Sequence, residues 1–69
     1  MDVISFRRTA DTHAANVYRG GVFIGSIQWH TYRAPRFVLA SGLCEIAYDH
    51  LKVVTHKLTE CMDAGCFVE

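Results

Sequence analysis

The sequence predicts a small α+β domain, in which an antiparallel sheet of three or four strands is followed by one long C-terminal helix packed on one face. Residues 16–30 form two runs rich in β-branched and aromatic residues around Gly20-Gly21, a dipeptide typical of a two-residue hairpin turn. Residues 42–62 carry apolar side chains at three- and four-residue spacing, which indicates a helix. A chain of 69 residues is predicted to be one domain, residues 1–69.

Two further strands are predicted outside the hairpin, at residues 3–7 and at residues 36–40. Residues 32–35 are predicted to be a connector, because Pro35 disfavours the helical conformation at the residue before it and marks a turn. In the last strand, Val38 should point away from its two apolar neighbours. The predicted order is therefore four strands and then a helix.

The hairpin turn pairs Arg19 with Val22, Tyr18 with Phe23 and Val17 with Ile24, and side chains alternate between the two faces. We expect the core on the face with the larger aromatic content, which holds Asn16, Tyr18, Phe23, Gly25, Ile27 and Trp29. The exposed face would then hold Ala15, Val17, Arg19, Val22, Ile24, Ser26, Gln28 and His30. A β-bulge at Gly25 would change this arrangement, because it would turn Ile24 and Ile27 toward the same side.

The predicted helix is bounded by Ser41, whose hydroxyl suits an N-cap, and by Gly65, which suits a C-cap. Its apolar stripe consists of Leu43, Ile46, Ala47, Leu51, Val54, Leu58 and Cys61. Residues 66–68 either fold back onto the core or fray.

Charge is balanced over the chain but unevenly distributed along it. Residues 1–40 contain five arginines against two aspartates, and residues 41–69 contain five acidic residues against two lysines. Neither half reaches the charge density of a dedicated nucleic-acid binder. No apolar run approaches ~18 residues, so we expect no membrane span and no membrane partner. Residues 1–11 lack the apolar stretch of a secretory signal, and three cysteines without framework spacing favour a reducing, cytoplasmic setting.

No motif indicates catalysis, so we expect neither an enzyme nor a cofactor. His50 and His56 are six residues apart and would point to different sides of a helix, so we expect no metal site. Cys44 falls in the first turn of the predicted helix, where a thiol pKa can be lowered. No base can be assigned to it, so we interpret Cys44 as a small semi-buried side chain.

The candidate partner-binding surface lies on the expected exposed face of the hairpin. Val17, Val22 and Ile24 would form an apolar patch there, which indicates a contact surface for a protein partner or for a second copy in a homodimer. The bland alternative is that these residues are simply good strand formers. Arginines and an aromatic residue would anchor and flank the patch: Arg19, Tyr32, Arg33 and Arg36. An alternative surface for a basic partner is an acidic helix face with Glu45, Asp49 and Glu60, which two lysines interrupt.

The same arginines, together with Tyr32, also suit a small RNA- or DNA-binding domain. The three-strand-plus-helix portion is similar to a double-stranded RNA-binding domain. It departs from that family at SGLCEIAYDHL, which is acidic and poor in lysine where the family carries a lysine cluster, and it lacks the first helix of the family. Nucleic-acid binding is therefore the alternative interpretation.

The stretch NVYRGGVFIGSIQWH followed by FVLASGLCEIAYDHLKVVTHKL combines a tight hairpin, a further strand and one capped helix. This arrangement resembles small phage-encoded accessory proteins, including the anti-CRISPR proteins. The resemblance covers the whole chain in architecture, with no diagnostic motif and no residue roles to carry over. It implies a non-enzymatic inhibitor that occupies a surface on a larger host protein or ribonucleoprotein complex in the host cytoplasm.

Overall fold

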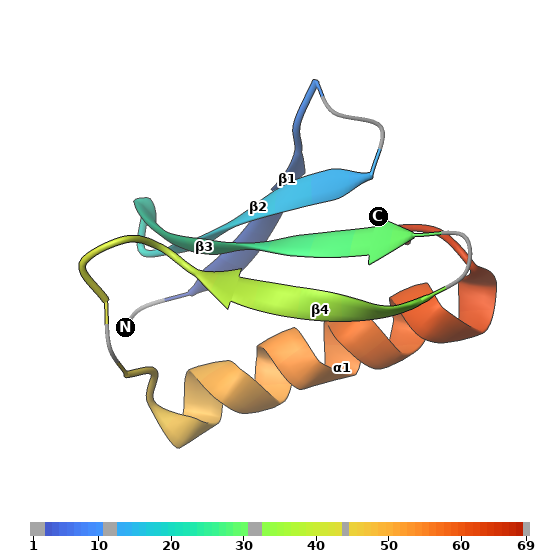
Figure 1. Ribbon diagram of the computed structural model, residues 1–69. Coiled ribbons are helices and arrows are strands. Elements are labelled where there is room, and N and C mark those ends of the chain that lie inside the picture. The colour runs from blue at the N-terminus through green and yellow to red at the C-terminus, as the bar shows by residue number, and fades with distance from the viewer. Residues whose placement is uncertain (1–2, 11–12, 31–32, 44, 69) are drawn as a thin grey trace.

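The fold is an antiparallel sheet with one helix beneath it (Figure 1). The computed structural model describes residues 3–10, 13–30, 33–43 and 45–68. These residues form β1 (Ile4–Arg8), β2 (Ala14–Arg19), β3 (Val22–His30), β4 (Arg33–Leu39) and α1 (Tyr48–Ala64). The strands pair in chain order, β1-β2-β3-β4, and each pair is antiparallel. The predicted α+β class is confirmed.

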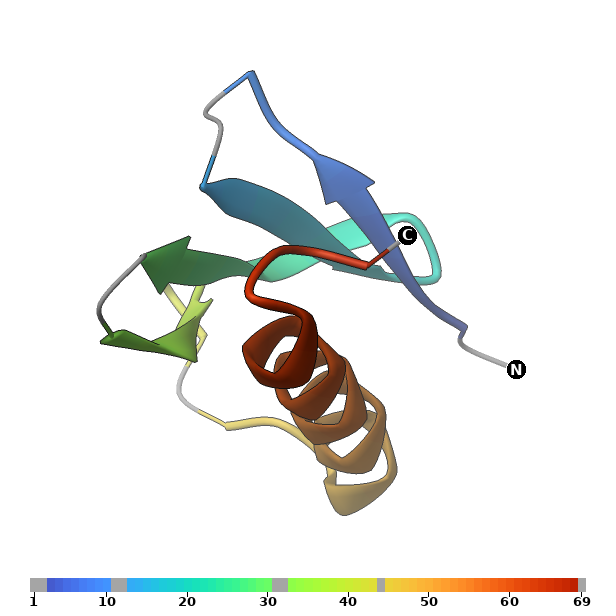
Figure 2. The ribbon, with the colours of Figure 1, turned by 90° about the vertical axis from the view of Figure 1, so that its right-hand side faces the viewer.

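The helix covers one face of the sheet only. α1 runs along β4 and β3 in Figure 1, and its principal contacts are with β4. Figure 2, which views the helix nearly end on, shows the segment after α1 crossing back toward β1 and β2. No element in the described part of the chain covers the opposite face of the sheet.

A β-bulge sets the register of the β2–β3 hairpin. Gly20 and Gly21 have φ of 57° and 86°, as a two-residue hairpin turn requires, and Tyr18 pairs with Phe23 as predicted. Beyond this pair the register shifts, because Val17 pairs with Gly25 and not with the residue before it. A β-carbon on Gly25 would collide with the carbonyl oxygen of Val38, so the glycine permits the close approach of β4.

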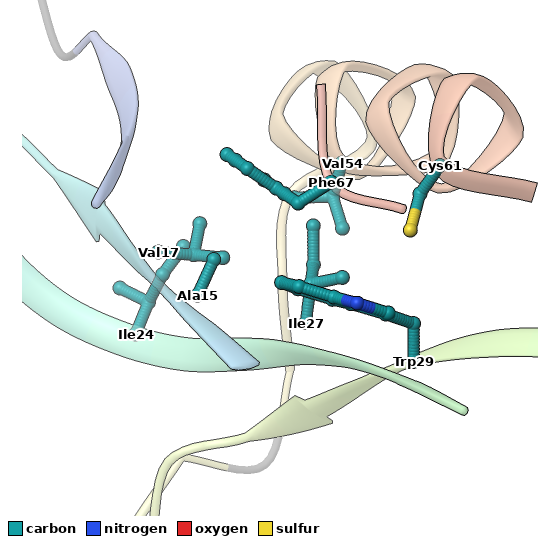
Figure 3. Close-up of a cluster of buried hydrophobic side chains, with 8 residues drawn as sticks. All are labelled: Ala15, Val17, Ile24, Ile27, Trp29, Val54, Cys61 and Phe67. Carbon is teal, nitrogen blue, oxygen red and sulfur yellow. The ribbon is translucent and has the colours of Figure 1, made fainter. Parts of the chain in front are cut away.

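Along β2, the core lies on the face that we predicted to be exposed to solvent. The buried residues are Ala15, Val17, Ile24, Ile27, Trp29, Val54, Cys61 and Phe67 (Figure 3). The prediction that Ala15, Val17 and Ile24 are exposed is therefore wrong. So is the assignment of Asn16, Tyr18 and Phe23 to the core, since all three retain solvent exposure and Phe23 is 45% exposed.

Cross-strand neighbours explain why β2 buries this face. Phe6 of β1 lies opposite Val17, and Ile27 of β3 lies between Ala15 and Phe37 of the two neighbouring strands. These pairs form a continuous apolar layer on the helix side of the sheet. Ile27 follows the bulge, and its predicted burial is confirmed.

The C-terminal segment completes the core. Phe67 is 6% exposed, and its ring stacks on that of Trp29 with 5.5 Å between centroids and 18° between planes. The ring centroid of Phe6 lies 6.3 Å from that of Phe67. Lys57 Nζ donates a hydrogen bond to the carbonyl oxygen of Val68 at 2.9 Å. Residues 66–68 therefore fold back onto the core, the first of the two predicted alternatives.

The boundaries of two elements differ from the predictions. α1 begins at Tyr48, and its N-cap Ala47 makes no side-chain cap hydrogen bond, so the predicted start at residue 42 is wrong. Gly42 has a φ of 92°, a left-handed conformation that a helix cannot contain. The predicted C-cap is confirmed, since Gly65 is left-handed and donates to the carbonyl of Cys61. Pro35 lies within β4, where an edge strand tolerates it, so the connector predicted there is wrong.

Replacement of Ile24 by alanine should lower the free energy of unfolding by about 2–5 kcal/mol, because it removes a buried aliphatic side chain. The same replacement at Val22, which is 61% exposed, should cost about 1 kcal/mol or less. Urea unfolding followed by Trp29 fluorescence measures both. Equal losses would contradict the burial of Ile24, because Val22 lies on the same side of β3 but beyond the core, next to the hairpin turn.

Candidate binding surface

The structure separates the residues predicted to form the partner-binding patch. Val17 and Ile24 are 0% and 3% exposed, so neither reaches a partner in the folded chain, and the predicted apolar patch is wrong. Val22 is exposed near the hairpin turn. Arg19 lies on the helix side of the sheet, where it lines a cleft of about 190 Å³ with Ile24 and Glu45.

Arg36 lies on the opposite, uncovered face, because it pairs with Gln28 in the register of β3 and β4. Tyr32 and the side chain of Arg33 lie outside the described part of the chain, as does Cys44. The predicted arginine cluster is therefore divided between the two faces of the sheet.

The alternative acidic set is also divided. Asp49 lies in the first turn of α1, whereas Glu45 precedes the helix. Glu60 lies near the other end of α1, with its Oε1 3.3 Å from His56 Nε2 and 3.5 Å from Lys57 Nζ. Two neighbouring side chains therefore already contact Glu60.

The uncovered face of the sheet, called the open face below, brings together side chains that no sequence motif connects. The strand register places them in three rows: Ser5, Tyr18 and Phe23; Arg7, Asn16, Ser26 and Val38; Ala14, Gln28 and Arg36. The rings of Tyr18 and Phe23 meet edge to face with centroids 5.9 Å apart. Phe23 and Val38 are 45% and 41% exposed, so the open face is partly apolar.

Polar contacts hold part of this face in place. Gln28 Oε1 accepts hydrogen bonds from Arg36 Nε at 3.4 Å and Nη2 at 3.2 Å, which orients the guanidinium across β3 and β4. Asn16 Nδ2 donates to the hydroxyl oxygen of Tyr18 at 3.4 Å. Arg7 is exposed, and within the described residues its side chain has no hydrogen bond or ion pair.

Charge is segregated across the sheet. The four strands contain no aspartate or glutamate. The described acidic residues all lie in α1 or in the segment before it: Glu45, Asp49, Glu60 and Asp63. The open face therefore presents two guanidinium groups and two aromatic rings, with no carboxylate among its described residues.

Three residues of the open face, Asn16, Tyr18 and Phe23, were predicted to lie in the core. The Tyr18–Phe23 pair was predicted correctly, and the alternation in β2 offered a signal, since Ala15 and Val17 are apolar whereas Asn16 between them is polar. Aromatic content outweighed this signal in our prediction.

The described residues contain no group of three or more histidine, cysteine or acidic side chains arranged to hold a metal ion. The one described helix does not combine the length and apolar character needed to cross a membrane. Cys61 is 2% exposed, and burial, with a smaller effect of the neighbouring Cys66, raises the pKa of its thiol.

The two described cysteines should differ sharply in reactivity toward a thiol reagent at neutral pH. We expect Cys66, which is exposed, to be modified at least about tenfold faster than Cys61, because thiolate and access are both required. Peptide mapping by mass spectrometry after timed labelling measures both rates. Comparable rates in the folded protein would contradict the burial of Cys61 in the core.

No family model, curated protein or solved structure matches the chain. The functional interpretation of the open face therefore rests on its own geometry and charge.

Proposed function

We propose that this chain is a non-enzymatic protein-binding module whose open face occupies a surface on a larger partner. The supporting observation is the partly exposed Tyr18–Phe23 pair, with Arg7 in the next row and Arg36 in the row beyond it, on a sheet face that no described element covers. Tyrosine and arginine are enriched among the residues that dominate binding energy at interfaces. Rings already packed against each other also lose little conformational freedom on binding.

The size of the open face suits one small interface. Strands ~4.8 Å apart with ~3.3 Å per residue give a four-stranded face roughly 20 Å on a side. A standard interface covers about 800 Å² of accessible surface on each partner. The open face supplies much of such an area, and the adjoining sheet edge would supply more.

The resemblance to small phage-encoded accessory proteins supports the choice of partner class. We place the partner among larger host protein or ribonucleoprotein complexes of the cytoplasm, and the effect of binding as inhibition of an anti-CRISPR-like kind. The inhibitor acts by occupying a surface, so it needs no catalytic group of its own.

A tagged chain used to capture proteins from bacterial lysate tests the proposal through matched variants. Phe23→Glu replaces one ring of the aromatic pair by a charge and should weaken capture of a discrete protein complex at least tenfold. Met62→Glu is the control, since Met62 is exposed on α1, and should leave capture unchanged. Circular dichroism establishes that both variants are folded.

Two outcomes of that experiment would contradict the proposal. Capture that survives Phe23→Glu but is lost in Met62→Glu would place the partner on the helix. Capture that disappears when the lysate is treated with nuclease would favour the second candidate, a nucleic-acid-binding domain.

The second candidate keeps one specific observation in its favour, because aromatic rings beside arginines form a stacking platform for single strands. The small number of cationic side chains on the open face counts against nucleic-acid binding. Arg7 and Arg36 are the two described cationic side chains in the open-face rows. Release of counterions by two phosphate contacts gives a slope of only about −1.4 in the logarithm of affinity against that of salt concentration. Protein binding therefore remains the better-supported proposal.

A further inference from the structure

The outer edge of β1 has backbone groups that face away from the sheet. Gly20 N–H donates to the carbonyl of Val3 at 3.0 Å, and Thr9 N–H donates to the carbonyl of Ala14 at 3.2 Å. Because bonded pairs alternate along an antiparallel ladder, the backbone groups of Ile4 and Phe6 point away from β2. Within the described chain, no backbone hydrogen bond reaches these outward groups of Ile4 and Phe6.

Two clefts flank this edge, one on each face of the sheet. The cleft on the helix side has a volume of about 360 Å³, and its described lining is Phe6, Arg7, Arg8, Lys57 and Phe67. The cleft on the open face has a volume of about 310 Å³, and its described lining is Ser5, Phe6, Arg7, Tyr18 and Gly21. Phe6 and Arg7 contribute to both clefts, so the two lie on either side of the same stretch of β1.

The helix-side cleft is cationic. Lys57 Nζ lies 5.4 Å from the centre of the Phe6 ring and 5.5 Å from that of Phe67, and the lysine side chain is only 16% exposed. The guanidinium of Arg8 lies 5.7 Å from the ring of Trp29. None of the described lining residues is acidic, but Lys57 Nζ also lies 3.5 Å from Oε1 of Glu60, so an incoming anion would share this ammonium with Glu60. A charge this shielded from water attracts an anion more strongly than a fully solvated one.

We propose that an extended, acidic segment of the protein partner adds to β1 as a fifth strand. Its backbone bonds to the outward groups of Ile4 and Phe6, and its side chains enter the two clefts alternately, because successive residues of a strand point to opposite faces. Carboxylates enter the helix-side cleft, and apolar side chains enter the cleft beside Tyr18. This inference rests on the proposed protein-binding function and names the chemistry of the partner.

The edge of β4 is a less suitable site for an added strand than β1, and a second copy of this chain is a less suitable occupant than an acidic segment. In β4, Pro35 has no N–H to offer an added strand, and the pairing with β3 shifts between Gln28 and His30, so the regular part of that edge is short. A second copy paired through β1 would bring Arg7 and Arg8 of both chains to one seam. No described residue of β1 is acidic, so nothing there would neutralise those charges.

The test titrates the full chain, labelled with ¹⁵N, with two blocked heptapeptides that alternate valine with glutamate or valine with lysine. We expect the glutamate peptide to shift the amide signals of Ile4 and Phe6 and to bind at least tenfold more tightly than the lysine peptide. Methylation of the peptide nitrogens in the bonding register should abolish binding, whereas methylation of the alternate nitrogens should not.

Matched variants separate charge from folding. Lys57→Gln should reduce affinity for the glutamate peptide several-fold, and Lys52→Gln, on the same helix, should leave it unchanged. Because Lys57 also bonds the C-terminal segment, Arg8→Gln, which alters the other cationic side chain on the helix side of β1, serves as a second variant with the same expected loss. Thermal unfolding establishes that each variant is folded.

Several results would overturn the inference. No shift at β1 with millimolar glutamate peptide, or equal binding of both peptides, would reject an acidic added strand. Shifts of the β1 amides with protein concentration alone would assign the edge to a second copy, and equivalent shifts with an oligothymidylate in place of the peptide would assign it to nucleic acid. If the glutamate peptide does not bind while capture of the partner still depends on Phe23, only the inference about the β1 edge is rejected. Capture that is independent of Phe23 rejects the proposed function itself.

Discussion

One helix and the segment that follows it, residues 65–68, must cover a whole face of a four-stranded sheet, and the stack of Phe67 on Trp29 makes this possible. α1 contacts mainly β4, which leaves the β1 side of the apolar layer to the C-terminal segment. Burial of one large aromatic side chain stabilises a fold by about 1.5–3 kcal/mol. In so short a chain, where the core is thin, that contribution is a large share of the whole.

The same constraint explains why the other face stays open. The chain has no second helix in its described part, so apolar residues are concentrated on the helix side of each strand. The bulge at Gly25 adds to the apolar residues on the helix side, because it turns both Ile24 and Ile27 of β3 toward α1. Phe23, one position before Ile24, is thereby directed to the open face, and Tyr18 accompanies it through the cross-strand pair.

Local signals in the sequence predicted much of the fold. The Gly20-Gly21 turn, the order of elements and the Gly65 cap each depend on a few adjacent residues, and each was predicted correctly. The buried face of β2 was predicted wrongly, although its alternation offered a signal and we had named a bulge at Gly25 as an alternative. Adjacent residues do not decide whether that bulge forms, because the need for a glycine there comes from the approach of β4. Likewise Ser41 has the chemistry of an N-cap, but the left-handed Gly42 after it delays the helix to Tyr48.

The candidate surface combines groups that are distant in sequence, which is why no motif revealed it. Arg7 belongs both to the open face and to the two clefts at the edge of β1, so the proposed sheet-face contact and the proposed added strand would form one continuous interface. The described acidic residues lie in α1 or in the segment before it, so the described sheet surface is positive although the chain as a whole is neutral.

The most direct test of a one-sided sheet is the relaxation of side-chain protons by a neutral gadolinium chelate in solution. The account predicts strong enhancement for the rings of Tyr18 and Phe23 and the methyls of Val22, and weak enhancement for the methyls of Val17 and Ile24. Val17 methyls that relax as fast as those of Val22, with a protected Phe23 ring, would contradict it and place the core on the other face.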